Sequence, residues 1–289
     1  AVCDAICRLM YPRDCFGLCC GSLVQADLKT LIESAGKNGF GSISVWPTLY
    51  QATLDAGLSE HDIKALLRDN EVRVTEIDPL MSWLDLELAP DDMAAAFYRF
   101  DEDYFYRMAE VLGATTLNVI EYQDTGLGEL ERIERLGAVC DRAQSSGLNV
   151  SIEFMSFSPI KDLPTALNLV SQVGSSNLGV NIDLWHHFRG VGTLEQLRAL
   201  DPKMIAALQV SDLAATPWPN LMEETAMGRM LPGEGQGLVA EALTVLRDVG
   251  VDVPVNLEVF SLDLMSETAD VAAATLAQSV DRLVRASAG

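Results

Sequence analysis

The chain has 289 residues, of which 49% are hydrophobic, and a formal net charge of −22. This length suits one large α/β barrel, for which about 250 residues is usual, or two ordinary domains. The negative charge argues against nucleic acid and anionic membranes as partners, because binding to them depends on Lys and Arg that neutralise phosphates. The sequence has neither an apolar run long enough for a membrane span nor the apolar stretch of a signal peptide, so we expect a soluble, cytoplasmic protein.

The N-terminal region is rich in cysteine. Five of the six cysteines fall within the first twenty residues, at Cys3, Cys7, Cys15, Cys19 and Cys20. Such a cluster could bind zinc or an iron–sulfur centre, but it contains no C-x2-C pair and no second cluster follows. We interpret these residues as small, reduced thiols of a cytosolic protein, and residues 1–15 as an extension whose structure the sequence does not define.

Eight short apolar runs, rich in β-branched residues, alternate with helical patterns along the chain. The runs are residues 16–20, 41–46, 71–77, 115–120, 148–154, 178–183, 205–211 and 254–260. Near-continuous apolar runs are typical of parallel strands that are covered by helices on both faces, and eight strands close a β/α barrel. No linker or low-complexity tract divides the chain. We therefore predict an α/β protein with one (β/α)8 TIM-barrel domain over residues 1–289.

Helices are expected between the strands. Their ranges are 25–38, 58–69, 101–112, 129–146, 162–173, 193–200, 238–249 and 267–286. In 162–173, for example, Asp162 predicts the N-cap and Gly174 the end of the helix. Two long connections, 78–100 and 212–237, follow the third and seventh strands. They are expected on the catalytic face of the barrel, where long loops commonly act as lids or substrate walls.

Four of the predicted strands have an oxygen-donor side chain at or near their carboxyl end. These side chains are Glu153, Asp183, Gln209 and Glu258. In a parallel barrel the carboxyl ends of the strands converge on one face, so the four side chains are expected to meet around a hard divalent cation. Acidic residues are common in this chain, and any one of them alone would be interpreted as a surface or capping residue. The recurrence at strand ends favours a metal site.

These segments also resemble a known superfamily. The run "IDLWHHFRG" is similar to a strand-six motif of Asp, two residues, His, then Arg and Gly. The run "LQVSD" resembles the strand-seven motif of members that use Gln as a metal ligand, and "GRMLPGEG" resembles the loop that follows. On these motifs the chain resembles the xylose-isomerase-like barrels, which include sugar phosphate isomerases and epimerases, hydroxypyruvate isomerase, inosose dehydratase and dehydroshikimate dehydratase.

The resemblance implies one divalent cation, Mn²⁺ or Mg²⁺ first and Co²⁺ as an alternative, held by the four oxygen donors. By analogy with related epimerases, Glu153 and Glu258 are the candidates for exchanging protons with the substrate. His186 matches the spacing of the strand-six motif and is expected to donate a hydrogen bond to the substrate or to act as an acid.

Other residues are candidates for substrate binding. Arg229 is expected to clamp a substrate oxygen, or alternatively to form a loop-stabilising ion pair with Glu223 or Glu224. The aromatic rings of Trp46, Trp185 and Trp218 follow strand ends and are candidates for stacking against a sugar or cyclohexane ring.

The function expected from these features is a metal-dependent isomerase or epimerase of a small keto-sugar or keto-polyol. Proton abstraction next to the carbonyl is its first step. The first alternative is a dehydratase of a cyclic keto-polyol, such as a dehydroshikimate-like or inosose-like compound, which starts with the same step. The second is a non-catalytic sugar-binding barrel or a subunit of a larger enzyme. The expected partner is a small polyhydroxy carbonyl compound, and the sequence leaves open whether the chain forms a homo-oligomer.

Overall fold

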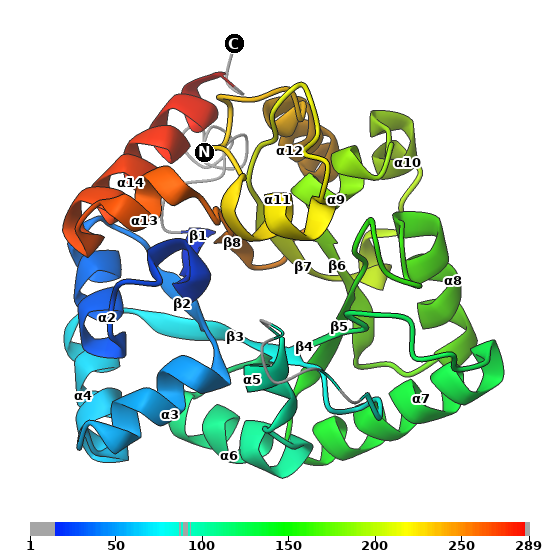
Figure 1. Cartoon of the computed structure of the whole chain (residues 1–289), viewed down its shortest axis with the longest axis horizontal. Coiled ribbons are helices and arrows are strands. Elements are labelled where there is room, and N and C mark those ends of the chain that lie inside the picture. Colours follow the sequence, from blue (N-terminus) through cyan, green and yellow to red (C-terminus); the bar gives the residue numbers. More distant parts are fainter. Residues whose placement is uncertain (1–14, 87, 89–91, 93, 287–289) are drawn as a thin grey trace, which may run out of the picture.

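A computed structural model describes residues 15–86, 88, 92 and 94–286. Eight parallel strands form a closed barrel in which each strand pairs with its sequence neighbours and β1 pairs with β8 (Figure 1). The strands are β1 (Phe16–Cys19), β2 (Ser42–Val45), β3 (Arg73–Leu80), β4 (Thr116–Ile120), β5 (Asn149–Glu153), β6 (Leu178–Asp183), β7 (Ile205–Val210) and β8 (Val255–Leu257). The predicted barrel is confirmed, with small differences at the strand ends.

All the predicted helices are present, and they form the outer ring of the barrel (Figure 1). They are α2 (Leu28–Lys37), α4 (Glu60–Asp69), α6 (Glu102–Leu112), α7 (Glu129–Ser145), α8 (Leu163–Val173), α10 (Leu194–Arg198), α12 (Val239–Asp248) and α14 (Ala269–Ala286). In α8 the Asp162 side chain accepts a hydrogen bond from the Thr165 amide at 2.9 Å, and Gly174 ends the helix with a φ of 66°. Both ends agree with the sequence. No helix in the described part of the chain is long and apolar enough to cross a membrane.

Several short helices were not expected. They are η2 (Cys20–Leu23), α3 (Pro47–Asp55), α5 (Ala95–Tyr98), α9 (Leu184–Arg189), η3 (Pro202–Met204), α11 (Leu221–Met227) and α13 (Leu262–Ser266). Most are too short to show a full apolar stripe, which is the signal that reveals longer helices. Except for η3, they follow the carboxyl ends of strands, and α5 and α11 lie beside the barrel opening (Figure 1). The short helices that follow the strands therefore border the mouth of the barrel.

The third strand is longer than the sequence indicates. It was expected to end at Ile77, but β3 continues to Leu80, with a shift in its register to β4 between these two residues. Asp78 therefore belongs to the strand and not to the connection. Glu76 and Asp78 lie two positions apart on this strand, and both are buried. Side chains two positions apart on a strand share a face, so both belong to the same side of the sheet.

The barrel interior contains many polar residues near its carboxyl end. Val150 and Ile152 of β5 are fully buried in the apolar core, whereas Ser151 and Glu153 alternate with them. The Ser151 hydroxyl donates to Asn118 Oδ1 at 2.8 Å, and Asn118 Nδ2 donates to Glu153 Oε2 at 2.7 Å. This chain of hydrogen bonds fixes the Glu153 carboxyl group at the mouth of the barrel.

Candidate active site

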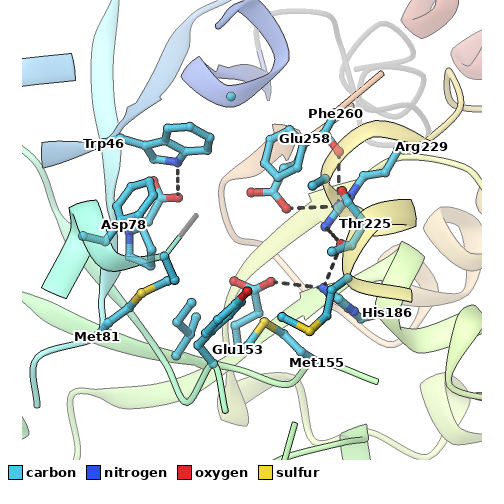
Figure 2. Close-up of a pocket in the computed structure, with 18 of the residues that line it drawn as sticks. Trp46, Asp78, Met81, Glu153, Met155, His186, Thr225, Arg229, Glu258 and Phe260 are labelled. Atoms are coloured by element: carbon cyan, nitrogen blue, oxygen red, sulfur yellow. Dashed lines mark hydrogen bonds and ion pairs between the residues drawn. The ribbon is translucent and has the colours of Figure 1, made fainter. Parts of the chain in front are cut away.

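The four side chains predicted as metal ligands all lie at the carboxyl end of the barrel. Glu153 ends β5, Asp183 ends β6, Gln209 is near the end of β7, and Glu258 directly follows β8. All four are buried. Figure 2 shows Glu153 and Glu258 facing a shared cavity with His186 and Arg229.

Asp183 links the barrel to α9. Its Oδ1 accepts a hydrogen bond from the Trp185 amide at 2.7 Å, which caps the helix, and its Oδ2 accepts one from Arg229 Nη1 at 2.7 Å. Burial by itself raises the pKa of this carboxyl group, but the Arg229 guanidinium and the amide donor outweigh it, and the pKa is lowered. Asp183 is therefore ionised at neutral pH.

Arg229 is the main cation of the site. Its Nη1 lies 2.7 Å from Asp183 Oδ2 and 3.0 Å from Glu258 Oε2, so the guanidinium bridges two of the predicted ligands. Its Nη2 donates to Thr225 Oγ1 at 2.8 Å, and the group lies over the ring of Phe260 at 4.8 Å. The alternative of an ion pair with Glu223 or Glu224 is wrong.

Glu224 pairs instead with Arg189, which comes from the "HHFRG" motif. Arg189 Nη2 also donates to the Ala214 carbonyl at 2.9 Å, and Glu224 Oε2 accepts from the Trp218 amide at 3.0 Å. These contacts tie the 212–237 connection to α9. The motif arginine thus holds one wall of the barrel mouth.

His186 faces the cavity as a neutral hydrogen-bond donor. The Ser156 amide donates to its Nδ1 at 3.3 Å, so the neutral ring carries its proton on Nε2. Nε2 lies 4.0 Å from Glu153 Oε1 and 3.5 Å from Thr225 Oγ1. Burial, reinforced by Arg229 and opposed by Asp183, lowers the pKa of His186 to about 3. The adjacent His187 contacts the Thr193 carbonyl at 3.1 Å and does not line the cavity.

A cavity of about 330 Å³ opens above these residues. The acidic and basic residues of its lining are Asp78, Glu153, Glu258, His186 and Arg229. The rest of its wall is largely apolar and includes Met81, Ala94, Phe97, Ile120, Tyr122, Met155, Phe157, Met222, Phe260 and Met265. An apolar wall with a few convergent polar groups is typical of a small-molecule site.

The three candidate tryptophans occupy different places. Trp46 lines the cavity, as expected of a ring that stacks on substrate. Trp185 is fully buried, with Arg229 over its ring at 5.3 Å, and it is not part of the cavity wall. Trp218 is half-buried against Gly228, also outside that wall. The structure therefore places only Trp46 where it can touch a ligand in this cavity.

Two buried acids on β3, Glu76 and Asp78, lie at or beneath the site and were not among the predicted site residues. Gln209 Nε2 donates to Glu76 Oε1 at 3.2 Å and to Glu258 Oε1 at 3.2 Å, so Glu76 lies beneath the site. Asp78 lines the cavity and accepts a hydrogen bond from Trp46 Nε1 at 3.0 Å. Burial raises the pKa of Asp78 to about 7. The signal was present in "TEIDPL", where two acids alternate with apolar residues on a strand that should be buried.

The cysteines play a smaller part. Cys19 Sγ lies 3.7 Å from Glu258 Oε1, and Cys20 Sγ accepts a hydrogen bond from the Trp46 amide at 3.2 Å. Both are buried, reduced thiols, and burial raises the pKa of each. Cys3 and Cys7 lie outside the described residues. The described thiols agree with the interpretation of reduced cysteines.

The oxygen donors are of the kind that a hard divalent cation prefers, but among the described residues Glu153 and Asp183 form one close cluster and Glu258 belongs to another, with Arg229 between Asp183 and Glu258. Burial, together with repulsion by Glu258 and Asp183, raises the pKa of Glu153 well above its usual value. Burial raises that of Glu258 as well, although Arg229 opposes the effect. Gln209 Oε1 is buried and accepts no hydrogen bond from the described residues. A cation bound among these oxygens would offset the repulsion and satisfy the amide oxygen.

A second donor set could be drawn from the same atoms. Oxygens of Glu153 and Asp183 and a ring nitrogen of His186 lie within 4.8 Å of one another. However, the Ser156 amide leaves His186 Nε2 protonated, and a protonated nitrogen does not bind metal. The Ser156 contact therefore favours oxygen atoms over His186 as donors to a metal, and it leaves the Nε2 proton of His186 directed toward the cavity.

Comparisons with known proteins agree with this arrangement. Residues 32–283 match the family model described as xylose isomerase-like TIM barrel. Inosose isomerases from Bacillus velezensis (strain DSM 23117 / BGSC 10A6 / LMG 26770 / FZB42) and Bacillus subtilis (strain 168) are 26% identical over 153 residues and 25% identical over 145 residues. These matches cover 52% and 50% of this chain and 54% and 51% of the relatives, so the chain spans about half the length of the curated relatives it matches.

Solved structures share the fold along almost the whole chain. The IOLI protein with a binding zinc atom has a TM-score of 0.81 at 18% identity, covering 94% of this chain and 98% of the other. The probable 3-DHS dehydratase AsbF from Bacillus anthracis has a TM-score of 0.72 at 18% identity, covering 92% and 98%. D-psicose 3-epimerase with D-tagatose from Clostridium cellulolyticum H10 has a TM-score of 0.66 at 18% identity, covering 94% and 98%. With the family match over most of its length, the chain belongs to the xylose isomerase-like TIM barrels.

Proposed function

We propose that this protein is a divalent-metal-dependent isomerase or epimerase of a small keto-sugar or keto-polyol. The observation that carries the proposal is the pair of buried carboxyl groups, Glu153 and Glu258, which face one cavity beside Asp183, His186 and Arg229. A sugar-binding module has no need of two such acids with raised pKa values in one apolar cavity. The inosose isomerases that match half of the chain support a keto-polyol as substrate.

Glu153, Asp183, Gln209 and Glu258 are the residues that would hold the cation. When bound, it would polarise a substrate carbonyl and stabilise the negative charge that develops when the neighbouring carbon loses a proton. Mn²⁺ and Mg²⁺ suit oxygen donors, and Co²⁺ is an alternative. The zinc atom of the IOLI structure adds Zn²⁺ to the ions that should be tested.

The two glutamates supply the bases. One carboxylate removes the proton next to the carbonyl. Return of a proton to the same carbon from the opposite side gives an epimer, and return to the former carbonyl carbon gives an isomer. Burial raises the pKa values of both groups, which makes each carboxylate a stronger base. Asn118 donates to Glu153 Oε2 at 2.7 Å, which leaves Oε1 for the substrate.

His186 and Arg229 orient the substrate. His186 is neutral, and its Nε2 proton can be donated to a substrate oxygen near Glu153. Arg229 holds Glu258 Oε2 at 3.0 Å, while Oε1 of the same carboxyl group accepts a hydrogen bond from Gln209 Nε2 at 3.2 Å. The apolar wall excludes water, which strengthens each of these interactions.

The proposal can be tested by hydrogen exchange. Metal-loaded protein is incubated in deuterated water with inososes, D-tagatose and a wider panel of keto-sugars, and the products are analysed by mass spectrometry. We expect one deuterium at the carbon next to the carbonyl and no change in mass beyond this label. Loss of water, with a product that absorbs in the ultraviolet, would assign a dehydratase instead. Binding of a sugar without exchange or turnover for every supplied metal would favour a non-catalytic barrel.

A further inference from the structure

Asp78 is a buried acidic residue in the wall of the cavity. The residue is 3% exposed, and its carboxyl group lies on the opposite side of the cavity from His186 and Arg229 (Figure 2). Its Oδ2 accepts from Trp46 Nε1 at 3.0 Å, whereas its Oδ1 accepts no hydrogen bond of regular geometry from the described residues, although the buried Ser44 hydroxyl lies near enough to the carboxyl group to lower its pKa. A buried acceptor without a partner is costly, so this oxygen is suited to a donor that arrives with a ligand.

The orientation of Asp78 is fixed by its neighbours. The Trp46 ring packs edge-to-face against Phe97 and Phe260, with centroid distances of 5.3 and 5.7 Å. A Cβ atom at Gly21 would lie only 2.3 Å from Phe260 and 2.4 Å from Trp46, so that position accepts glycine alone without a shift of the rings. The indole therefore holds Oδ2, so a ligand donor that reaches this carboxyl group would bind at Oδ1 and compete with the neighbouring Ser44 hydroxyl.

The position of Asp78 relative to the proposed base limits what it can bind. A carboxyl oxygen of Asp78 and one of Glu258 lie within 4.8 Å of each other. A substrate hydroxyl that donates to Asp78 would therefore be attached close to the carbon whose proton Glu258 exchanges. The neighbouring wall includes Met81, Phe97 and Ile120, and its polar members are the Tyr122 hydroxyl in the lining and the Cys19 thiol, which lies within 4.8 Å of oxygens of Asp78 and Glu258.

We propose that Asp78 is a specificity-determining residue whose Oδ1 accepts a hydrogen bond from a substrate hydroxyl group near the reacting carbon. This inference rests on the proposed function, because a keto-polyol supplies the hydroxyl. It narrows the substrate class to polyhydroxy carbonyl compounds that carry a hydroxyl at this position and present their C–H faces to the apolar wall. A site that hydrogen-bonds a hydroxyl discriminates strongly against an analogue without it, since a buried acceptor is then left unpaired.

The experiment compares inososes with analogues that each lack one hydroxyl group. For the metal-loaded full chain, kcat/KM is measured for every compound in the wild type, in Asp78→Asn and in Asp85→Asn. Asp85 is a matched control, because it lies on the connection that follows β3 but is exposed and paired with Arg135 at 2.9 Å. We expect one deoxy analogue to be poor for the wild type and for Asp85→Asn. In Asp78→Asn the ratio of kcat/KM for the parent inosose to kcat/KM for this analogue should be about 10-fold or more smaller than in the wild type, as expected when a hydrogen bond to a charged group is lost.

Each other outcome overturns the inference. If Asp78→Asn lowers kcat/KM equally for all analogues, Asp78 has a purely structural role. If the variant keeps the selectivity of the wild type, Asp78 does not contact the substrate. Both results leave the proposed function intact. If the wild type neither binds nor converts any inosose or keto-sugar, the proposed function fails and the inference falls with it. Should Asp78→Asn fail to fold, Trp46→Phe provides a second variant. It frees Oδ2 and should reduce the same selectivity by a smaller factor.

Discussion

The carboxyl groups in the two halves of the barrel mouth differ in their hydrogen-bond and ion-pair partners. On the β5 to β8 side, Asp183 and Glu258 share the Arg229 guanidinium, and Glu153 accepts from Asn118. On the β3 side, one oxygen each of Glu76 and Asp78 is buried without a hydrogen-bond partner among the described residues. The first half is organised around the Arg229 charge, whereas in the second Asp78 lines the cavity and Glu76 lies beneath it. We therefore expect substitutions in the first half to affect metal binding and chemistry, and those in the second to affect selectivity.

The largest effect is expected from Asp183→Ala. This change removes a buried, ionised ligand, so the protein should lose its metal and on the order of 10³-fold or more of its turnover. Elemental analysis of the purified chain should give about one divalent ion per wild-type chain and almost none in the variant. Asp201→Ala, at an exposed cap outside the mouth, is the control. Stoichiometric metal in Asp183→Ala would remove the basis of the proposed ligand set.

The next effect tests the two proposed bases. Glu153→Gln and Glu258→Gln each keep an oxygen donor but cannot accept the proton. At least one variant should retain substrate binding while its turnover falls by on the order of 10²-fold or more. Calorimetric binding and steady-state rates with an inosose separate the two effects. Near-normal turnover in both variants would place the base elsewhere, with His186 as the next residue to examine.

Thermal unfolding of an Arg229 variant tests the half of the mouth that is formed by β5 to β8. Without metal, Arg229→Gln leaves Asp183 and Glu258 without their shared cation, and breaking a buried pair costs about 3–5 kcal/mol. For a chain of this size, Tm in chelator should fall by on the order of 10 °C. Added Mn²⁺ should raise Tm more in the variant than in the wild type, because the metal replaces the missing charge. Arg282→Gln, which breaks an exposed pair with Glu234, is the control. An equal effect of Mn²⁺ on variant and wild type would contradict this account.

The contrast between the halves also explains what the sequence could reveal. The strands were predictable because apolar runs repeat at regular spacing, and Glu153, Asp183, Gln209 and Glu258 stand out at or near the ends of such runs. Asp78 was hidden because Pro79 suggests a turn, although β3 runs through it. The contact of Arg229 with Asp183 joins residues far apart in the sequence, and no local pattern encodes it. The same holds for the burial of Trp185 away from the cavity.

The smallest effect is expected at Cys19, on the β1 side of the mouth. Its thiol lies 3.7 Å from Glu258 Oε1, and burial, which raises its pKa, keeps it protonated at neutral pH. Without a metal the protonated thiol is a weak donor to Glu258, but its Sγ also lies within 4.8 Å of oxygens of Asp78 and Glu258, where a bound cation would lower its pKa. Cys19→Ser preserves a donor of similar size. Turnover and metal content should stay within about threefold of the wild type, because a weak, replaceable hydrogen bond contributes only about 0.5 kcal/mol. If the variant instead lost its metal or its turnover as completely as Asp183→Ala, Cys19 would be a ligand, and the division of the mouth into a charged half and an accepting half would have to be redrawn.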